Sequence, residues 1–295
     1  MSSTTCHICS GSRAKLFMQK DGSDYYRCPD CKLEFIFPQP DDIALEKIYS
    51  ENYYNSWGLH VDSSKGEKSK RLTFEYRVKL IEHELKQDDS ILDCGCATGF
   101  FLDLLKEKGF VPYGVEISLF AANVCRRKFG KQNIFLGNFE NAEFGSVREN
   151  MFSAIFMTDY LEHVRNPREV LVTAFRFLRP GGLLVITTPD TSSLSYTAMG
   201  GSWIHYKSEH LYYFSKRNIE LLLTQAGFLY SNHSKGWKYF SMDYVHRQFN
   251  AYPVPVLSPL VRVLFGILPA GLRQKTFSVH AGEMIVIAKK PTSEK

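Results

Sequence analysis

Four cysteines form two Cys-x-x-Cys pairs near the start of the chain. Cys6 and Cys9 make the first pair, and Cys28 and Cys31 make the second, with residues 10–27 between them. Two thiolates three residues apart on a tight turn can hold one edge of a tetrahedron around a metal ion, and a second such turn supplies the other edge. The spacing predicts a structural zinc site with four cysteine ligands and no open position for catalysis.

The stretch "ILDCGCATGFFL", residues 91–102, joins an apolar strand, a loop of small residues and the start of a helix. Gly95 and Gly99 allow the backbone of this loop to approach a ligand closely. The N–H groups at the start of the helix favour an anionic ligand group near Gly99. The stretch therefore predicts a ligand-binding loop between a strand and a helix.

Two acidic side chains narrow the choice of ligand. Asp93 ends the strand before the loop, and Glu116 ends the next strand, where a carboxylate can accept hydrogen bonds from both hydroxyls of a ribose. A nicotinamide dinucleotide is one alternative, but Ala97 replaces the middle glycine that a pyrophosphate needs, and Asp93 would repel it. S-adenosylmethionine offers an ammonium group for Asp93, a carboxylate for the helix start and a ribose for Glu116, so these residues favour it.

Three further side chains are candidates for proton transfer. His210 lies in "KSEHLYYFS", where the adjacent Glu209 could set its tautomer and stabilise its protonated form. The alternative for His210 is a packing and helix-capping role. His163, in "LEHV", follows an expected strand and either lines the site or bonds a loop carbonyl. We therefore take His210, Glu209 and His163 as the candidate catalytic residues.

Alternating apolar strands and amphipathic helices must position these residues. Strands are expected at residues 90–94, 111–117, 133–138, 152–158, 183–189, 228–235 and 282–290, and helices at residues 65–86, 100–109, 118–130, 167–178 and 215–227. Strands that are apolar throughout predict a sheet covered on both faces and largely parallel, the doubly wound α/β class. Ligands bind beyond the carboxyl ends of the strands in such a sheet, where the candidate residues fall.

The same pattern divides the chain into three parts. Residues 1–40 predict a zinc ribbon, residues 41–88 a helical linker that caps the cofactor site, and residues 89–295 the α/β domain. Two stretches interrupt the alternation and are expected insertions, at residues 190–214 and 238–281.

Composition, net charge and apolar runs predict the class of protein and its location. The 295 residues are 44% hydrophobic and 23% charged, with a net charge of +5, which does not favour a dedicated nucleic-acid binder. Neither a secretory signal nor an apolar run of about 18 residues is seen, so we expect a soluble cytoplasmic protein. The segment 253–272 is apolar, yet Arg262 and four prolines argue against a spanning helix. It predicts a lid or packing element, or a peripheral membrane contact.

An ordered set of motifs carries a family resemblance, namely "LDCGCATG", "VEIS", "GNFENAEF", "DYLEHVRNP" and "FLRPGGLLVITTPD". With these motifs, residues 90–190 resemble a class I S-adenosylmethionine-dependent methyltransferase, a Rossmann-like fold. The resemblance implies contacts to the methionine part of the cofactor from a loop group of residues. This group is Asp93, Gly95, Cys96, Ala97 and Gly99.

The resemblance also implies contacts to the rest of the cofactor. Glu116 and Ile117 would flank the ribose and adenine, and Asn138 and Phe139 would meet the edge and face of the adenine. The family usually has aspartate where Asn138 stands, and an amide oxygen can still accept from the adenine amine. Thr158, at the end of the fourth strand, would face the sulfonium.

The zinc ribbon, "YSENYY" and "EHLYYFS" together resemble bacterial methyltransferases that act on nucleotide-linked sugars and related metabolites. In the sugar C-methyltransferases, a Glu-His pair like Glu209 and His210 is the proposed base. Tyr53, Tyr54 and other tyrosines are candidate walls of the acceptor pocket. The absence of a "[DNS]PP[YFW]" motif favours O- or C-methylation of a small molecule over N-methylation of nucleic acid or protein.

Two alternatives to a small-molecule methyltransferase stay open. An RNA methyltransferase could use the ribbon to grip RNA, although residues 1–40 carry five basic and four acidic side chains, a poor match to phosphate. A non-catalytic scaffold could keep the fold and the cofactor. The intact pair of Asp93 and Glu116 favours an enzyme over this scaffold.

Overall fold

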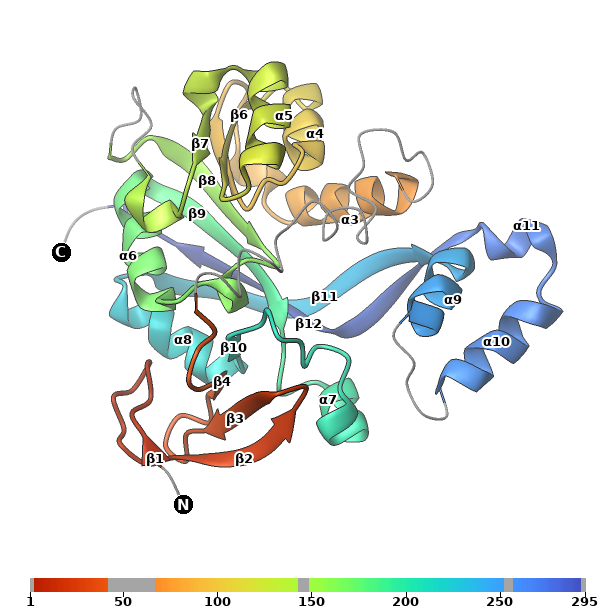
Figure 1. The fold of residues 1–295 in the computed structure, drawn as a ribbon. Helices are drawn as coiled ribbons and strands as arrows, with labels where there is room; N and C mark the ends of the chain where they lie inside the picture. The colour runs from red at the N-terminus through yellow and green to blue at the C-terminus, as the bar shows by residue number, and fades with distance from the viewer. Residues whose placement is uncertain (1–2, 42–66, 143–148, 252–256, 293–295) are drawn as a thin grey trace.

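The structure is a computed structural model that describes residues 3–41, 67–142, 149–251 and 257–292. Within these residues a seven-stranded sheet has the order β11-β12-β9-β8-β5-β6-β7 (Figure 1). Its strands are β5 (Ser90–Cys94), β6 (Val111–Glu116), β7 (Ile134–Leu136), β8 (Phe152–Thr158), β9 (Leu178–Pro189), β11 (Leu229–Ser241) and β12 (Thr276–Lys289). The strands from β9 to β7 are parallel, and β12 and β11 are antiparallel. The predicted α/β class is confirmed.

Helices cover both faces of this sheet because its strands are apolar on both sides. The helices are α3 (Glu67–Lys79), α4 (Phe100–Glu107), α5 (Leu119–Phe129), α6 (Pro167–Phe177) and α8 (Lys216–Gln225). Ile91 and Phe156 pack with α3, α4 and α5 on one face, whereas Leu92 and Met157 pack with α6 and α8 on the other. Because β5, β6 and β8 are parallel, their carboxyl ends lie at one edge of the sheet.

Local capping sets where two of these helices begin. The Ser118 hydroxyl accepts a hydrogen bond from the Ala121 N–H at the start of α5. Asn166 accepts from the Glu169 N–H at the start of α6, where Pro167 occupies the first turn. Both helices therefore start directly after loops that border the strand ends.

A second, antiparallel sheet contains the ribbon. Its order is β1-β2-β3-β4-β10, with β1 (Ser3–Thr4), β2 (Ala14–Lys20), β3 (Ser23–Arg27), β4 (Glu34–Ile36) and β10 (Tyr212–Tyr213). Tyr212 pairs with Phe35, and Tyr213 pairs with Glu34. The last strand of the ribbon sheet thus comes from the stretch at residues 190–214 that the sequence assigns to an insertion.

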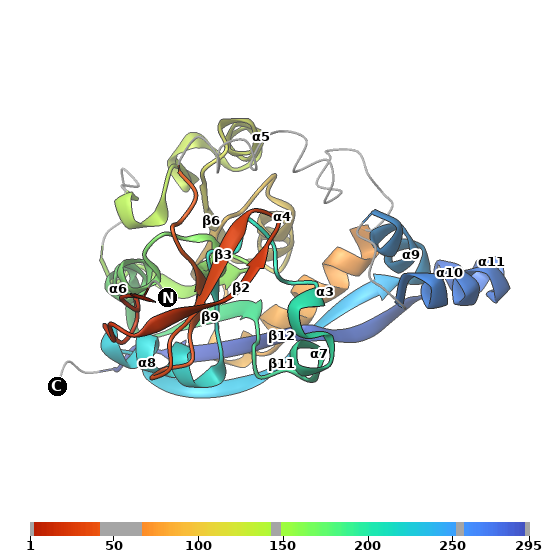
Figure 2. The same cartoon turned by 60° about the horizontal axis from the view of Figure 1, so that its bottom comes forward.

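The ribbon and this insertion also share a core. The insertion contains α7 (Leu194–Met199) and the 3-10 helix η5 (Gly200–Ser202). Trp203, Tyr206 and Tyr213 pack with Tyr25 and Ile36 of the ribbon in one buried cluster. The two segments therefore form one structural unit on the sheet, although they are far apart in sequence (Figures 1 and 2).

The second predicted insertion, residues 238–281, is an arm. Strands β11 and β12 run past their expected ends at residues 235 and 282, because the alternating polar and apolar residues there pair with each other outside the apolar sheet. Helices α9 (Met242–Ala251), α10 (Leu257–Ile267) and α11 (Ala270–Arg273) lie at the end of this arm. Across the described ranges, none of the helices combines the length and apolar character needed to span a bilayer.

The predicted linker at residues 41–88 is described only in part. Helix α3 and the 3-10 helix η1 (Glu82–Glu84) lie within the helix expected at residues 65–86. Residues 42–66, which include the tyrosines at 53 and 54, lie outside the described residues. The cap over the cofactor site therefore stays a prediction.

Candidate active site

The loop after β5 is held by the end of β6. The N–H groups of Gly95 and Cys96 donate to the Val115 carbonyl oxygen at 2.9 and 3.0 Å. Gly95 and Ala97 have φ angles of 77° and 48°, so the chain turns sharply here. This turn directs the loop's backbone towards the carboxyl edge of the sheet.

Glu116 fixes the same loop through its side chain. One carboxylate oxygen accepts from the Ala97 N–H at 2.8 Å, and the other accepts from the Ser118 N–H at 2.8 Å. Because each carboxylate oxygen has two lone pairs, both oxygens can still accept a hydroxyl. The geometry suits a ribose at Glu116 while the carboxylate keeps its orientation.

Asp93 is the second acidic group at this edge and is buried. Burial raises its pKa well above the usual range, the neighbouring Glu116 raises it further, and Arg77 opposes both. A cationic ligand group would remove this penalty, because it stabilises the ionised carboxylate. The site is therefore electrostatically matched to an ammonium or sulfonium group.

Among the predicted contact residues, Cys96, Gly99 and Ile117 differ in which of their atoms can reach a ligand. The Cys96 side chain is buried with its sulfur 3.9 Å from that of Cys125, so only its backbone faces the loop. A Cβ on Gly99 would lie 2.8 Å from Phe129, so Gly99 permits close packing of α5. Ile117, in contrast, is 53% exposed and can contact a ligand.

The adenine end requires one correction. Asn138 is exposed, directly before the 3-10 helix η3 (Phe139–Asn141). Phe139 is fully buried, and its ring centroid lies 5.9 Å from that of Phe177 in α6. Its ring therefore packs in the core and is not placed to stack on an adenine, contrary to the prediction.

Thr158 ends β8 beside several buried polar atoms that lack a hydrogen-bond partner among the described residues. These atoms are the hydroxyls of Thr158, Thr187 and Thr188, both carboxylate oxygens of Glu162 and Nδ1 of His210. A buried polar atom without a hydrogen-bond partner lowers the stability of the fold. Several such atoms together are expected where a bound ligand supplies the missing partners. The group at the end of β8 is therefore a candidate ligand site beside the loop after β5, which we call the donor loop.

Glu162, His163 and His210 converge at this place. One ligand atom from each lies within 4.8 Å of the others, and the two imidazole rings meet edge to face at 4.7 Å. Glu162 and His163 belong to the 3-10 helix η4 (Leu161–His163), while His210 comes from the insertion. The backbone N–H of Leu211 donates to the Glu162 carbonyl oxygen at 2.8 Å and joins the two segments.

Both imidazoles are neutral near pH 7. Burial, followed by the positive charge of Lys207, lowers the pKa of His163 to about 4. Burial, followed by His163 and Lys207, lowers the pKa of His210 well below its usual range. Neutral imidazoles can accept a proton, so the pair has the protonation state of a general base.

The carboxylate beside His210 is Glu162, a residue that the sequence analysis did not select. Glu209 is partly exposed, and its carboxylate accepts from the Ser208 hydroxyl at 3.4 Å. The pairing of Glu209 with His210 stays a prediction, but the geometry favours Glu162. The adjacent letters "EH" in "LEHV" were the signal for Glu162.

An ion network borders the cluster of Glu162, His163 and His210. The sequence analysis did not select its residues either. Lys238 of β11 contacts Asp159 at 3.0 Å and Glu283 of β12 at 2.5 Å. Although burial opposes ionisation, Lys238 lowers the pKa of Asp159 to about 2. Because Asp159 follows β8 while Lys238 and Glu283 lie within β11 and β12, far along the chain, no local pattern in the sequence marks them as neighbours.

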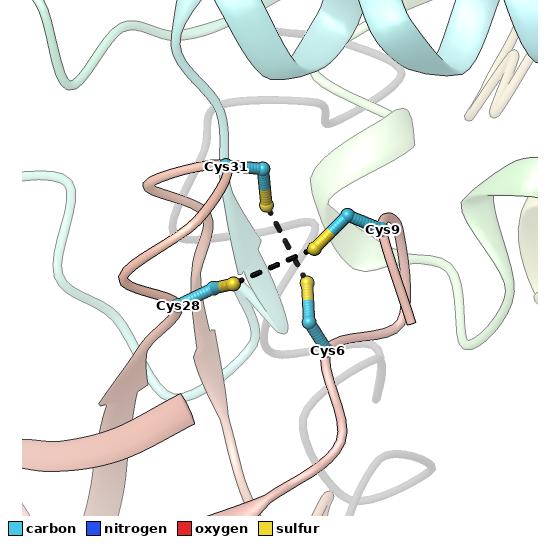
Figure 3. A group of neighbouring side chains, drawn as sticks. All are labelled: Cys6, Cys9, Cys28 and Cys31. Atoms are coloured by element: carbon cyan, nitrogen blue, oxygen red, sulfur yellow. Dashed lines mark hydrogen bonds between the residues drawn. The ribbon is translucent and has the colours of Figure 1, made fainter. Parts of the chain in front are cut away.

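Two groups of described side chains have the spacing of metal ligands. In the ribbon, the sulfur atoms of Cys6 and Cys31 are 3.5 Å apart, as are those of Cys9 and Cys28 (Figure 3). Four sulfurs about 2.3 Å from a zinc ion would lie about 3.8 Å from one another, so the four cysteines fit zinc. The second group, Glu162 with the two histidines, is less suited to a cation because Lys207 already supplies positive charge there.

Comparisons with known proteins identify the family of the chain. A family model described as a methyltransferase domain matches residues 68–231, more than half of the chain. A segment of 132 residues is 24% identical to the ubiquinone biosynthesis O-methyltransferase of Coxiella burnetii, covering 43% of this chain and 56% of that protein. A segment of 109 residues is 27% identical to the dTDP-4-amino-2,3,4,6-tetradeoxy-D-glucose N,N-dimethyltransferase of Saccharopolyspora spinosa, covering 37% and 44%. The chain spans about half the length of the curated relatives it matches.

Solved structures share the fold. A SAM-dependent methyltransferase of Thermotoga maritima aligns with a TM-score of 0.50 and 18% identity, covering 81% of this chain and 95% of that one. The YcgJ protein of Bacillus subtilis aligns with a TM-score of 0.50 and 13% identity, covering 75% and 99%. Together with the family model, the fold and the motifs, these matches show that the chain belongs to the methyltransferase-domain family, the class I S-adenosylmethionine-dependent methyltransferases.

Proposed function

We propose that this protein transfers a methyl group from S-adenosylmethionine to a hydroxyl or acidic carbon of a small molecule. The observation that carries the proposal is the neutral pair His210 and His163, with Glu162, beside the end of β8 and the donor loop. An amine acceptor can react in its unprotonated form, whereas a hydroxyl or carbon acid must lose a proton. A buried neutral base therefore favours O- or C-methylation.

Separate groups of residues would bind the donor and position the acceptor. The loop after β5, with Asp93 and Glu116, would orient the donor, and Ile117 and Asn138 would border its adenosine part. Bound S-adenosylmethionine supplies an electrophilic methyl group. Alignment of the acceptor with that methyl group is the larger contribution, and proton removal adds to it.

Proton removal is assigned to His210. Nδ1 of His210 would accept the proton that the acceptor oxygen or carbon loses when it takes the methyl group from the sulfonium, whose sulfur would keep the bonding electron pair. Glu162, whose pKa is raised by burial and then by Asp159, lies beside the imidazole and can share this proton. His163 packs edge to face on His210 and holds its ring in place.

The acceptor class is a sugar, a nucleotide-linked sugar or a related metabolite. Support comes from the relatives named above, one an O-methyltransferase and one acting on a nucleotide-linked sugar, at low identity. We further propose that Cys6, Cys9, Cys28 and Cys31 hold a structural zinc ion, which their sulfur spacing supports.

Labelling tests the proposal. The protein is incubated with methyl-labelled S-adenosylmethionine and either a panel of nucleotide-linked sugars and small phenols or total RNA. We expect label in a small molecule, and label only in RNA would overturn the acceptor class. Donor binding without transfer to any of these would favour the scaffold alternative.

A matched pair of histidine variants tests the base. His210→Ala should lower turnover by about 10²- to 10⁴-fold and leave donor binding nearly unchanged, because the imidazole acts on the acceptor proton. His83→Ala, at an exposed histidine of η1, should behave like the wild type. Unchanged turnover in His210→Ala would remove this histidine from the mechanism.

A further inference from the structure

The arm formed by β11 and β12 extends beyond the sheet that supports it. The pairing of β12 with β9 ends at Glu283 and Pro189, whereas β11 and β12 stay paired as far as Ser241 and Thr276. Helices α9, α10 and α11 lie at its far end, away from the donor loop and the ribbon (Figures 1 and 2). The arm therefore presents its helices to the surroundings of the protein.

Helix α10 carries an apolar stripe on its outer face. Leu260, Val263, Leu264 and Ile267 are 52%, 63%, 42% and 73% exposed, and their spacing of three, one and three residues places them on one side of the helix. The opposite side packs on α9, where the rings of Phe265 and His246 stack at 4.0 Å. The stripe is thus additional to the apolar residues that attach the helix to the arm.

The arm tip that carries this stripe has a net positive charge. Among the described residues of the arm tip from 242 to 279, Arg247, Arg262, Arg273 and Lys275 stand against one acidic residue, Asp243, a net charge of +3. Two arginines also stabilise the helices: Arg262 donates to Asn250 at 2.8 Å, and Arg273 donates to the Leu268 carbonyl oxygen at 2.8 Å. An exposed apolar stripe on a positively charged tip is typical of a helix that lies in a membrane interface.

We propose that α10 docks on a bilayer surface that contains anionic phospholipid, with its outer apolar residues inserted between the headgroups. At about 1.5 Å per residue its 11 residues are too short to cross a hydrocarbon layer of about 30 Å, so the helix lies along the surface. A second copy of the chain fits less well, because two arm tips of the same charge repel each other. Anionic headgroups, in contrast, complement the charge.

Vesicle sedimentation tests the proposal with the full-length protein. Wild type is mixed with vesicles of phosphatidylcholine alone or with 30% phosphatidylglycerol. We expect at least about tenfold more binding to the anionic vesicles, and loss of that binding in 0.5 M NaCl. Equal binding to both vesicles, or none to either, would overturn the proposal without any variant.

Substitutions then locate the contact. Ile267→Glu should lower binding to the anionic vesicles by about tenfold or more, because it places a carboxylate in the stripe. Leu194→Glu, at an apolar residue of α7 that is 84% exposed, is the matched control and should bind like the wild type. Unchanged circular dichroism and donor binding would show that the Ile267 variant is folded.

Two results would contradict this location. Ile267→Glu that still binds the anionic vesicles as the wild type does would remove α10 from the contact. A dimer in light scattering that Ile267→Glu converts to a monomer would assign the stripe to a second copy of the chain instead.

Discussion

Glu116 and Asp93, the two acidic residues at the donor loop, differ in how far the surrounding protein stabilises their ionised carboxylates. Glu116 accepts two backbone N–H groups, whereas Asp93 is buried beside it with a raised pKa. A buried ionised carboxylate costs folding free energy. Such a residue is expected where a ligand of opposite charge offsets that cost. An ionised Asp93 therefore lowers the stability of the ligand-free protein but strengthens the binding of a cationic ligand.

Replacement of Asp93 by asparagine tests this conflict. We expect the donor to bind about 10- to 100-fold more weakly, because one charge-assisted contact to its ammonium group is lost. Since the raised pKa of Asp93 means that its ionised form destabilises the native state above the unfolded pKa, the ligand-free variant should melt at a higher temperature near pH 7. Calorimetry and thermal denaturation measure the two effects, and a lower melting temperature with unchanged affinity would contradict both.

A second substitution separates the two glutamates near His210. Glu162→Gln should lower turnover by about tenfold or more without weakening donor binding, because it removes the carboxylate that shares the proton. Glu209→Gln should have the smaller effect, since that side chain contacts Ser208. Steady-state kinetics of both variants decide between them, and the reverse order would restore the pairing predicted from the sequence.

Residue types and strand ends made much of the donor loop predictable. Asp93 and Glu116 lie at the ends of apolar strands, so their place at the sheet edge needed no tertiary information. Phe139 was assigned wrongly because the direction of its ring depends on Phe177, which lies on a helix distant in sequence. Glu162 was missed because its role depends on a histidine from another segment.

At the scale of elements, the ribbon holds the insertion that carries His210. Strand β10 starts two residues after His210 and pairs with β4 of the ribbon. The buried Glu34 of β4 accepts hydrogen bonds from the Tyr196 and Tyr206 hydroxyls at 2.5 and 2.6 Å. Any change that loosens β4 should therefore reach the segment that carries His210.

Replacement of a cysteine of the proposed zinc site tests this connection. Cys28→Ser should abolish stoichiometric zinc and lower turnover much more than donor binding, because the donor loop belongs to the other sheet. Asp30→Asn, in the same turn but outside the ligand set, is the control and should keep zinc. Zinc content, donor affinity and turnover are measured on the same samples, and normal turnover without zinc would exclude a positioning role.

The sequence could not predict this connection between elements. The Cys-x-x-Cys spacing predicted a compact unit from residues 1–40, and the four sulfurs do converge. Two-residue strands such as β10 carry too little pattern to be recognised, and pairing between distant segments has no local signature. The same reason explains why the length of the arm exceeded the apolar strands predicted at residues 228–235 and 282–290.

At the scale of the whole molecule, buried histidines link folding to pH. Burial lowers the pKa of His163 to about 4 and of His205 to about 3, and it lowers the pKa of His210 well below 6.5. Such groups are neutral when folded and take up protons when unfolded, so stability is lost as pH falls below about 6.5. Asp93 and Glu162, with raised pKa values, act in the opposite direction over part of this range.

A comparison of two proteins isolates one histidine from these opposing effects. His205→Gln should be less stable than the wild type at pH 7.5, because His205 bonds the Ala281 carbonyl oxygen at 2.7 Å. As pH falls from 6.5 towards 4, the difference should shrink by about 1.4 kcal/mol per pH unit, since only the wild type must keep this imidazole neutral. Urea denaturation measures it, and a difference that is constant with pH would contradict the assignment.

The order in which the chain is made has a consequence for the ribbon sheet. Its first four strands end at Ile36, but the strand that completes the sheet starts at Tyr212. At roughly 5–20 residues per second, a ribosome needs on the order of 10–35 s to deliver that strand. During this interval the edge of β4 is uncovered on the nascent chain, so a chaperone or early metal capture would matter most then.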